Sequence, residues 1–269
     1  MSIWFSVIIL AVIQGITEFL PVSSSGHLAV LGQLFGLQSD EGLAFSIVLH
    51  AGSLVAIVVF YFKTLLSLLK KENLRVWGQI IIGTIPAGIG GVLLKMSGYD
   101  EVLFRDIFAI GISFLITASL LRLTGKNKFT GNAVTPLEKI SWKQSLIIGL
   151  SQMFAILPGI SRSGTTIAVG TFTGLQFEAA ATFSFLLALP AIGGAALLEM
   201  ISLCKSGFSI GKLSYLQLGT GFFISAAVSF AALSLLVAIV KRRKISMFSW
   251  YMFALGITVV AWQMIKLSR

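Results

Sequence analysis

Long apolar runs separated by short polar segments dominate the chain. Six runs of roughly 20 residues are predominantly apolar, and a helix of that length can cross the hydrocarbon core of a bilayer. These runs lie near 43–62, 76–95, 105–122, 178–203, 213–240 and 247–266. The pattern predicts an all-α polytopic membrane protein with a single integrated membrane domain.

Two further stretches, 3–36 and 142–175, are apolar but broken by proline, glycine and serine. Each is too interrupted to form one continuous span, yet long enough to enter the bilayer and turn back. Polar backbone at membrane depth is tolerated only where it is buried against protein or lines a water-filled cavity. We therefore expect both stretches to form re-entrant helix hairpins.

The two halves of the chain resemble each other. The breaks read Pro-Val-Ser-Ser-Ser-Gly-His at 21–27 and Pro-Gly-Ile-Ser-Arg-Ser-Gly at 158–164. Two other pairs of segments match in the same order, namely 45–49 with 183–187 and 108–113 with 253–258. Three ordered matches indicate an internal repeat.

Repeat 1 would cover residues 1–125 and repeat 2 residues 138–269, each with one re-entrant hairpin and three spans. Because three is an odd number, the second repeat begins on the opposite side of the membrane from the first. The sequence thus predicts an inverted-topology repeat whose two hairpins meet near the midplane.

The composition fits a membrane protein. Of the 269 residues, 56% are hydrophobic and only 11% are charged, whereas about 25% of residues in soluble domains are charged. No basic stripe interleaved with aromatic residues accompanies the net charge of +10, so nucleic-acid binding is excluded. The single Cys204 excludes an internal disulfide and a cysteine metal cluster. The first stretch lacks a basic region before its apolar run, and we expect no cleavable signal peptide.

The basic residues predict the orientation of the chain. On the expected topology, 13 of the 20 lie on one side of the membrane and six on the other. The richer side is cytoplasmic by the positive-inside rule, which places both termini and the opening of the site outside. The twentieth basic residue, Arg162, belongs to no loop and lies inside the second break.

Gln14 and Glu18 stand four residues apart and share one helix face. A carboxylate within an apolar helix is costly unless it is paired or hydrated. Glu18 is therefore a candidate general base, a proton-holding acid, part of a divalent-cation site with Gln14, or an ion-pair partner for Arg162.

The first break adds Ser23, Ser24, Ser25, Gly26 and His27, in which the serines suit a helix N-cap. His27 is a candidate acid–base group because hydroxyls and Glu18 lie close in sequence. The other histidine, His50, lies inside a span without nearby polar residues, and is interpreted as a helix–helix hydrogen bonder.

The second break surrounds Arg162 with hydroxyl and glycine residues, which are Ser161, Ser163, Gly164, Thr165 and Thr166. A helix N-terminus, hydroxyl donors and a guanidinium together favour an oxyanion, most naturally a phosphate or pyrophosphate. One half thus supplies an acid–base group and the other a phosphate clamp, a division that suits a reaction centre.

These motifs resemble those of the undecaprenyl-diphosphate phosphatases of the bacitracin-resistance (BacA-type) membrane family. The resemblance covers the whole chain and is strongest at [E/Q]-x-x-x-E, here Gln14 to Glu18, and at P-G-x-S-R-S-x-x-T, here Pro158 to Thr166. Where many members have Glu, this chain has Gln14, which leaves Glu18 as the only acidic ligand in the motif.

The resemblance implies a bacterial plasma-membrane enzyme that hydrolyses undecaprenyl diphosphate to undecaprenyl phosphate and inorganic phosphate. This reaction recycles the lipid carrier for peptidoglycan synthesis and confers bacitracin resistance. The resemblance also implies a divalent cation, Mg or Ca. Ser24, His27 or water could be the nucleophile, and we favour Ser24 with His27 as its acid–base partner.

Another class of function remains open. Inverted repeats with broken helices are also a transporter architecture, and a transporter or flippase of an anionic polyprenyl lipid is the alternative. The acid-phosphatase-like lipid phosphatases are excluded, because they need a histidine shortly after the Ser-Arg pair and residues 163–175 contain none.

Overall fold

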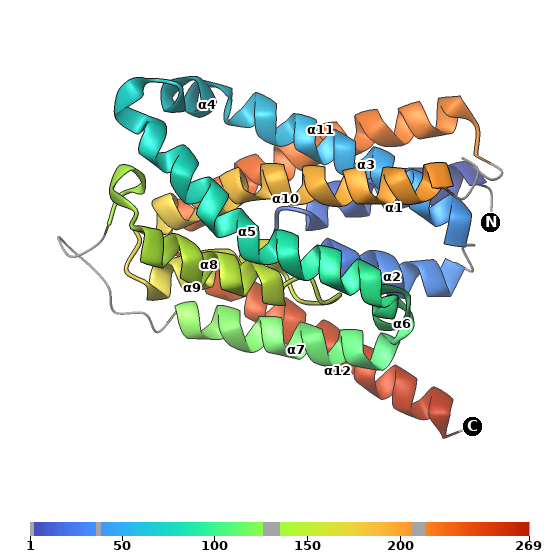
Figure 1. Ribbon diagram of the computed structural model, residues 1–269. Helices are drawn as coiled ribbons and strands as arrows, with labels where there is room; N and C mark the ends of the chain where they lie inside the picture. Colours follow the sequence, from blue (N-terminus) through green and yellow to red (C-terminus); the bar gives the residue numbers. More distant parts are fainter. Residues whose placement is uncertain (1–2, 36–38, 126–134, 206–212, 269) are drawn as a thin grey trace.

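The computed structural model describes residues 3–35, 39–125, 135–205 and 213–268. These ranges form a bundle of roughly aligned helices (Figure 1). The first part of the chain contains α1 (Ile3–Thr17), α2 (Ser24–Phe35), α3 (Ser39–Phe60), α4 (Phe62–Leu68), α5 (Leu74–Ser97), α6 (Tyr99–Arg105) and α7 (Ile107–Thr124). The second part contains α8 (Trp142–Phe154), α9 (Arg162–Phe172), α10 (Phe177–Lys205), α11 (Tyr215–Lys241) and α12 (Phe248–Leu267).

Within the described residues, five helices are long and apolar enough to cross a membrane, namely those that include α5, α7, α10, α11 and α12. A sixth span is a broken one, in which Ala44–Phe60 of α3 and Phe62–Leu68 of α4 meet at an angle of 69°. These elements lie over the six apolar runs predicted from the sequence. The protein is therefore an all-α, multi-pass membrane protein, and the bend beside Tyr61 is a feature that its apolar pattern did not reveal.

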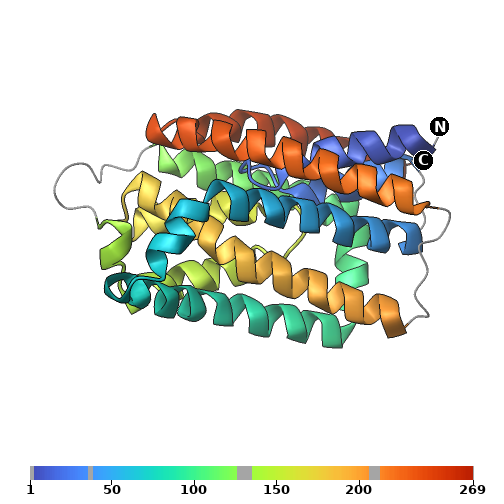
Figure 2. The same ribbon diagram turned by 90° about the horizontal axis from the view of Figure 1, so that it is seen from above.

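Two pairs of shorter helices form hairpins. At about 1.5 Å per residue, α1 with 15 residues and α9 with 11 fall well short of the ~30 Å hydrocarbon core. The chain turns back at 18–23 between α1 and α2, and at 155–161 between α8 and α9. The two hairpins enter from opposite ends of the bundle, and their breaks lie near the middle of its length (Figures 1 and 2).

Capping side chains begin the return helix of each hairpin. The Ser161 hydroxyl accepts a hydrogen bond from the Gly164 amide at 3.1 Å, which satisfies one of the free N–H groups at the start of α9. Before α2, the Ser23 hydroxyl accepts a longer hydrogen bond, 3.4 Å, from the Gly26 amide. A serine thus caps the return helix in both breaks, as predicted for the first break.

The backbones of the two breaks touch. A Cβ on Gly26 would lie 2.9 Å from the Cα of Gly159 and 2.4 Å from the ring of Phe114 on α7. Gly159 has a φ of +90°, and a Cβ there would lie 2.6 Å from Cβ of Ser113. Only glycine fits at these two positions, because a side chain at Gly26 would meet the second break and one at Gly159 would meet α7.

The entering helix of each hairpin packs along a long helix of the other half of the chain. Helix α1 of the first half packs along α11 of the second, and α8 of the second half packs along α5 of the first. Small residues permit the close approach: a Cβ on Gly15 would lie 2.8 Å from Cβ of Val228, and one on Gly149 would lie 2.4 Å from the Gly83 carbonyl oxygen. An inverted repeat would produce such an exchange, and the repeat itself stays a prediction. The start of α1 and the end of α12 lie at the same end of the bundle (Figures 1 and 2).

Candidate active site

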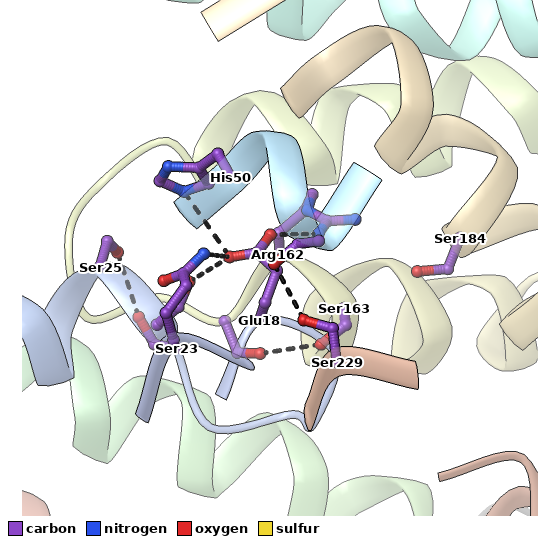
Figure 3. Close-up of polar contacts among 12 residues, drawn as sticks. Glu18, Ser23, Ser25, His50, Arg162, Ser163, Ser184 and Ser229 are labelled. Carbon is purple, nitrogen blue, oxygen red and sulfur yellow. Dashed lines mark hydrogen bonds and ion pairs between the residues drawn. The ribbon is translucent and has the colours of Figure 1, made fainter. Parts of the chain in front are cut away.

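Glu18 lies at the centre of a polar cluster in the first break (Figure 3). Its Oε1 accepts a hydrogen bond from Nη2 of Arg162 at 2.8 Å. Its Oε2 accepts hydrogen bonds from the Ser24 hydroxyl at 2.6 Å and from Nε2 of Gln14 at 3.0 Å. The two breaks therefore meet at one carboxylate, which joins the predicted acid–base group to the predicted phosphate clamp.

The surroundings of Glu18 explain how a carboxylate is accommodated there. Glu18 is only 6% exposed, and an isolated buried carboxylate would cost several kcal/mol. The guanidinium of Arg162 supplies the opposite charge, and three hydrogen bonds satisfy the oxygen atoms. A charge-assisted bond to a hydroxyl as short as that from Ser24 is among the stronger hydrogen bonds in proteins.

His50 belongs to this cluster, so its interpretation as a helix–helix hydrogen bonder without polar company was wrong. Its Nε2 lies 3.7 Å from Oε2 of Glu18 (Figure 3). Its Nδ1 donates to the carbonyl oxygen of Ser46 at 2.9 Å, and this leaves Nε2 as the nitrogen that faces the carboxylate. A protonated His50 would place a second positive charge beside Glu18.

The backbone of the first break is strained next to Ser24. Ser23 has a φ of +66°, in the left-handed region that a residue with a Cβ rarely occupies. Its hydroxyl lies 3.3 Å from that of Ser25. Such a conformation costs about 1–3 kcal/mol and persists at functional sites where neighbouring contacts impose it.

Arg162 is held by the second break. The amide of Ser161 donates to the Thr117 hydroxyl at 3.1 Å, and that hydroxyl donates to the carbonyl oxygen of Gly159 at 3.2 Å. Thr166 donates its hydroxyl to the carbonyl oxygen of Arg162 at 2.8 Å. The backbone that carries the guanidinium is thereby fixed to both α7 and α9.

A cavity of about 820 Å³ opens on the cluster. Apolar residues of α1, α2, α3, α5 and α10 form most of its wall, and it extends to Phe104 on α6 and Leu198 on α10. The predicted site residues that line it are Glu18, Ser23, Ser24, Ser25, Ser161 and Arg162. A mostly apolar cavity with a few converging polar groups suits an amphipathic ligand.

Other predicted binding residues lie behind this wall. The Ser163 hydroxyl donates to the Leu20 carbonyl oxygen at 3.2 Å, and the Thr166 hydroxyl lies 2.6 Å from that of Ser184. The remaining predicted binding residues that are not among those lining the cavity are Gln14, Gly26, Gly164 and Thr165. In this structure these residues pack behind the cavity wall and do not line the cavity itself.

His27 faces a second cavity of about 630 Å³, bounded by α1, α2, α7 and α12. Its Nδ1 donates to the Ser23 carbonyl oxygen at 2.7 Å, so a neutral Nε2 accepts from the Tyr251 hydroxyl, also at 2.7 Å. The expected pairing of His27 with Ser24 as acid–base partner is therefore not the arrangement found. Thr17 lines both cavities.

The predicted cation ligands, Glu18 and Gln14, do not fit a metal site. Both oxygens of the carboxylate already accept hydrogen bonds, and the guanidinium at 2.8 Å would repel a cation. Gln14 turns its Nε2, a donor, toward Glu18. No group of three or more potential metal ligands occurs among the His, Cys, Asp and Glu side chains that the structure describes.

Several residues of the site were not predicted. Four of them line the two cavities, namely His50, Gln152, Glu199 and Tyr251, and the fifth is Thr117, which holds the second break. All lie in helices that the sequence marks only as apolar spans or hairpin arms. The one available signal was the i, i+4 spacing of Ser46 and His50, which places both on one face.

Comparison with known proteins identifies the family. Residues 7–258 match the family model described as "Bacitracin resistance protein BacA". The chain is 37% identical to the "Undecaprenyl-diphosphatase" of Carboxydothermus hydrogenoformans over 96% of its own length and 97% of that relative. It is 38% identical to the protein of the same name from Bacteroides thetaiotaomicron, over 97% of its own length and 99% of the relative. The chain therefore belongs to the BacA bacitracin-resistance family.

Proposed function

We propose that this protein is an undecaprenyl-diphosphate phosphatase. It releases the terminal phosphate of the lipid diphosphate and leaves undecaprenyl phosphate, the carrier that peptidoglycan synthesis uses again. Bacitracin resistance accompanies this activity in the family. The observation that carries the proposal is that Glu18 bonds to both Ser24 and Arg162 at the wall of one cavity.

In the proposed reaction Ser24 is the nucleophile and Glu18 is the general base. The Ser24 hydroxyl already donates to Oε2 of Glu18 at 2.6 Å, within the range required for proton transfer. As Oγ forms a bond to the terminal phosphorus, its proton passes to Glu18. The bond from that phosphorus to the bridging oxygen breaks, and its electron pair leaves with undecaprenyl phosphate.

A water molecule then hydrolyses the phosphoserine. Glu18 first gives its proton to the departing lipid monophosphate and then accepts one from this water as the water oxygen bonds to phosphorus. As the bond between phosphorus and Oγ breaks, Glu18 returns that proton to Oγ, which regenerates Ser24 and releases inorganic phosphate. Arg162 neutralises charge on the phosphoryl oxygens during both steps. Phosphoryl transfer depends mainly on such positioning and neutralisation, and both are available at the meeting of the two breaks.

The apolar walls of the cavity would hold the first isoprene units of the lipid while its headgroup faces Arg162. We propose that the cavity opens to the outer side of the plasma membrane. The loop charges favour this orientation, because the basic-rich side lies opposite the expected position of the termini. The substrate would then enter laterally from the outer leaflet.

A divalent cation remains part of the proposal only as a companion of the substrate. Mg²⁺ commonly binds through substrate phosphates with few protein ligands and retains several waters. When bound in this way, it would offset charge on the diphosphate. The chemistry assigned above to Ser24, Glu18 and Arg162 does not depend on it.

The test is phosphate release from undecaprenyl diphosphate by the purified full chain in liposomes. We expect wild-type protein to release phosphate, and Glu18→Gln to lose at least about a hundredfold in kcat while still binding substrate. Glu178→Gln is the matched control, because Glu178 is exposed at the start of α10. Lipid transfer between leaflets without any phosphate release would instead support the flippase alternative and contradict the proposal.

A further inference from the structure

Arg162 uses only one arm of its guanidinium. Nη2 donates to Glu18, whereas Nη1 is buried and has no hydrogen-bond partner. A buried donor without an acceptor is costly, so such groups usually point to a ligand or an ordered water. Because Arg162 lines the large cavity, an acceptor for Nη1 can arrive from there.

Gln152, in the last turn of α8, also has buried polar atoms without hydrogen-bond partners. It is 2% exposed, and neither Nε2 nor Oε1 has a hydrogen-bond partner. Other buried glutamines are at least partly satisfied: Gln79 accepts from the Ser145 hydroxyl at 2.9 Å, and Gln217 accepts from the Ser214 amide at 2.8 Å. Burial alone therefore does not explain why the amide of Gln152 has no hydrogen-bond partner.

The same segment carries both unsatisfied groups to one cavity. Gln152 and Arg162 line it, and so do Ala155, Ile156 and Ser161 between them. The end of α8, the second break and the start of α9 thus form a continuous wall. Two polar groups on this wall present unused N–H donors, and a phosphate group offers oxygen acceptors for both.

We propose that Gln152 and Nη1 of Arg162 bind the second phosphate of the diphosphate, the one that remains on the lipid. This inference rests on the proposed function. The terminal phosphate must lie against Ser24 for attack, and the adjoining phosphate then requires its own donors. Gln152 would make the site select a diphosphate over a monophosphate.

The neutral amide suits this task. A lysine or a second arginine at this position would bind the phosphate of the product as tightly as that of the substrate. The lipid monophosphate would then leave the site more slowly. An amide donates hydrogen bonds without adding charge, so it orients the diphosphate and still permits the lipid monophosphate to leave. Gln152 is on this account a substrate-binding residue, and it takes no part in proton transfer.

The test compares Gln152→Met with wild-type protein, since methionine keeps the unbranched shape and removes the amide. Gln263→Met is the matched control: Gln263 also has an unpartnered buried amide oxygen, but it lines neither of the two cavities. The probes are methylenediphosphonate, which resists hydrolysis, and inorganic phosphate. Calorimetry on the full chain in detergent measures the affinity for each, and thermal unfolding measures stability without ligand.

We expect Gln152→Met to weaken methylenediphosphonate binding about tenfold, the effect of losing one hydrogen bond to a charged group. Inorganic phosphate binding should change less than about twofold, and the unfolding temperature should not fall, because an unsatisfied amide is removed. An unchanged diphosphonate affinity overturns the proposal. So does an equal loss for both probes, or a lower unfolding temperature with unchanged binding, since either indicates a structural role.

The outcome is separable from that of the proposed function. If wild-type protein hydrolyses undecaprenyl diphosphate and Gln152→Met binds the diphosphonate normally, only the role of Gln152 is refuted. If wild-type protein releases no phosphate, the proposed function fails whatever the binding data show.

Discussion

Nη2 of Arg162 donates a hydrogen bond to Oε1 of Glu18 at 2.8 Å across 144 residues of sequence. Arg162 begins the return helix of one hairpin, and Glu18 directly follows the entering helix of the other. This contact is possible because the breaks touch at Gly26 and Gly159. The catalytic proposal therefore depends on the packing of two hairpins as much as on their motifs.

Arg162→Lys should lower kcat by at least about a hundredfold. An ammonium group cannot reproduce the planar fork that reaches Glu18 with one arm and a phosphate with the other. The measurement is steady-state phosphate release, with Arg242→Lys as the control because Arg242 is exposed beyond α11. Turnover near that of wild type in the Arg162 variant would refute the clamp.

Trapping the phosphoenzyme should place the phosphate on Ser24. Its hydroxyl contacts the proposed base, whereas the ring of His27 lines the other cavity. After rapid acid quench, phosphoserine survives and phosphohistidine is lost, so peptide mass spectrometry under acidic and alkaline conditions separates the two. Label on His27 would contradict the mechanism, and label on no residue would favour direct attack by water.

His27 should act by positioning the strained Ser23. We expect His27→Ala to lose most activity and some thermal stability, because the Ser23 carbonyl oxygen loses its shorter hydrogen bond and keeps only the one from the backbone amide of residue 27 at 3.3 Å. His27→Gln, which can still donate to that oxygen, should recover part of both. Tyr251→Phe should cost less than about tenfold, the value of one neutral hydrogen bond.

Paired measurements of kcat and unfolding temperature on these three variants distinguish positioning from chemistry. If His27→Gln is as inactive as His27→Ala and both unfold at the wild-type temperature, His27 takes part in proton transfer and the positioning role is wrong.

Gly159→Ala should destabilise the protein by about 3 kcal/mol or more. A Cβ there would meet Ser113 at 2.6 Å and the Ile110 carbonyl oxygen at 2.7 Å, in addition to the strain of a φ of +90°. Gly174→Ala measures the cost of the backbone strain without a steric clash, because Gly174 has the same φ and no atom within 4 Å of its Cβ position. Equal unfolding temperatures for the two variants would show that the close contact of Gly159 with α7 contributes nothing.

The apolar pattern predicted the spans because length and hydropathy decide which helices cross a membrane. It could also locate both breaks, since proline and serine interrupt an apolar run visibly. The 69° bend beside Tyr61 has no such mark. No proline, glycine or serine lies next to it, so no local pattern records it.

The site was predictable only in part, and for the same reason. Glu18 and Arg162 are conspicuous because charges are rare in apolar hairpins. Proximity in sequence wrongly suggested that His27 serves Ser24, whereas α2 turns its ring toward Tyr251 on α12. His50 was missed because its distance from Glu18 depends on how α3 packs against the first hairpin.

The chamber that His27 lines offers a route to inhibition that avoids mimicking a diphosphate. Its walls are mostly apolar, and it shares Thr17 with the cavity that contains Glu18 and Arg162. One of its lining residues is His27, whose ring holds the Ser23 turn. An uncharged compound that filled it and turned the His27 ring away from the Ser23 carbonyl oxygen would release that turn. Such a drug would not compete with the substrate for Arg162, so accumulating lipid diphosphate would not overcome it.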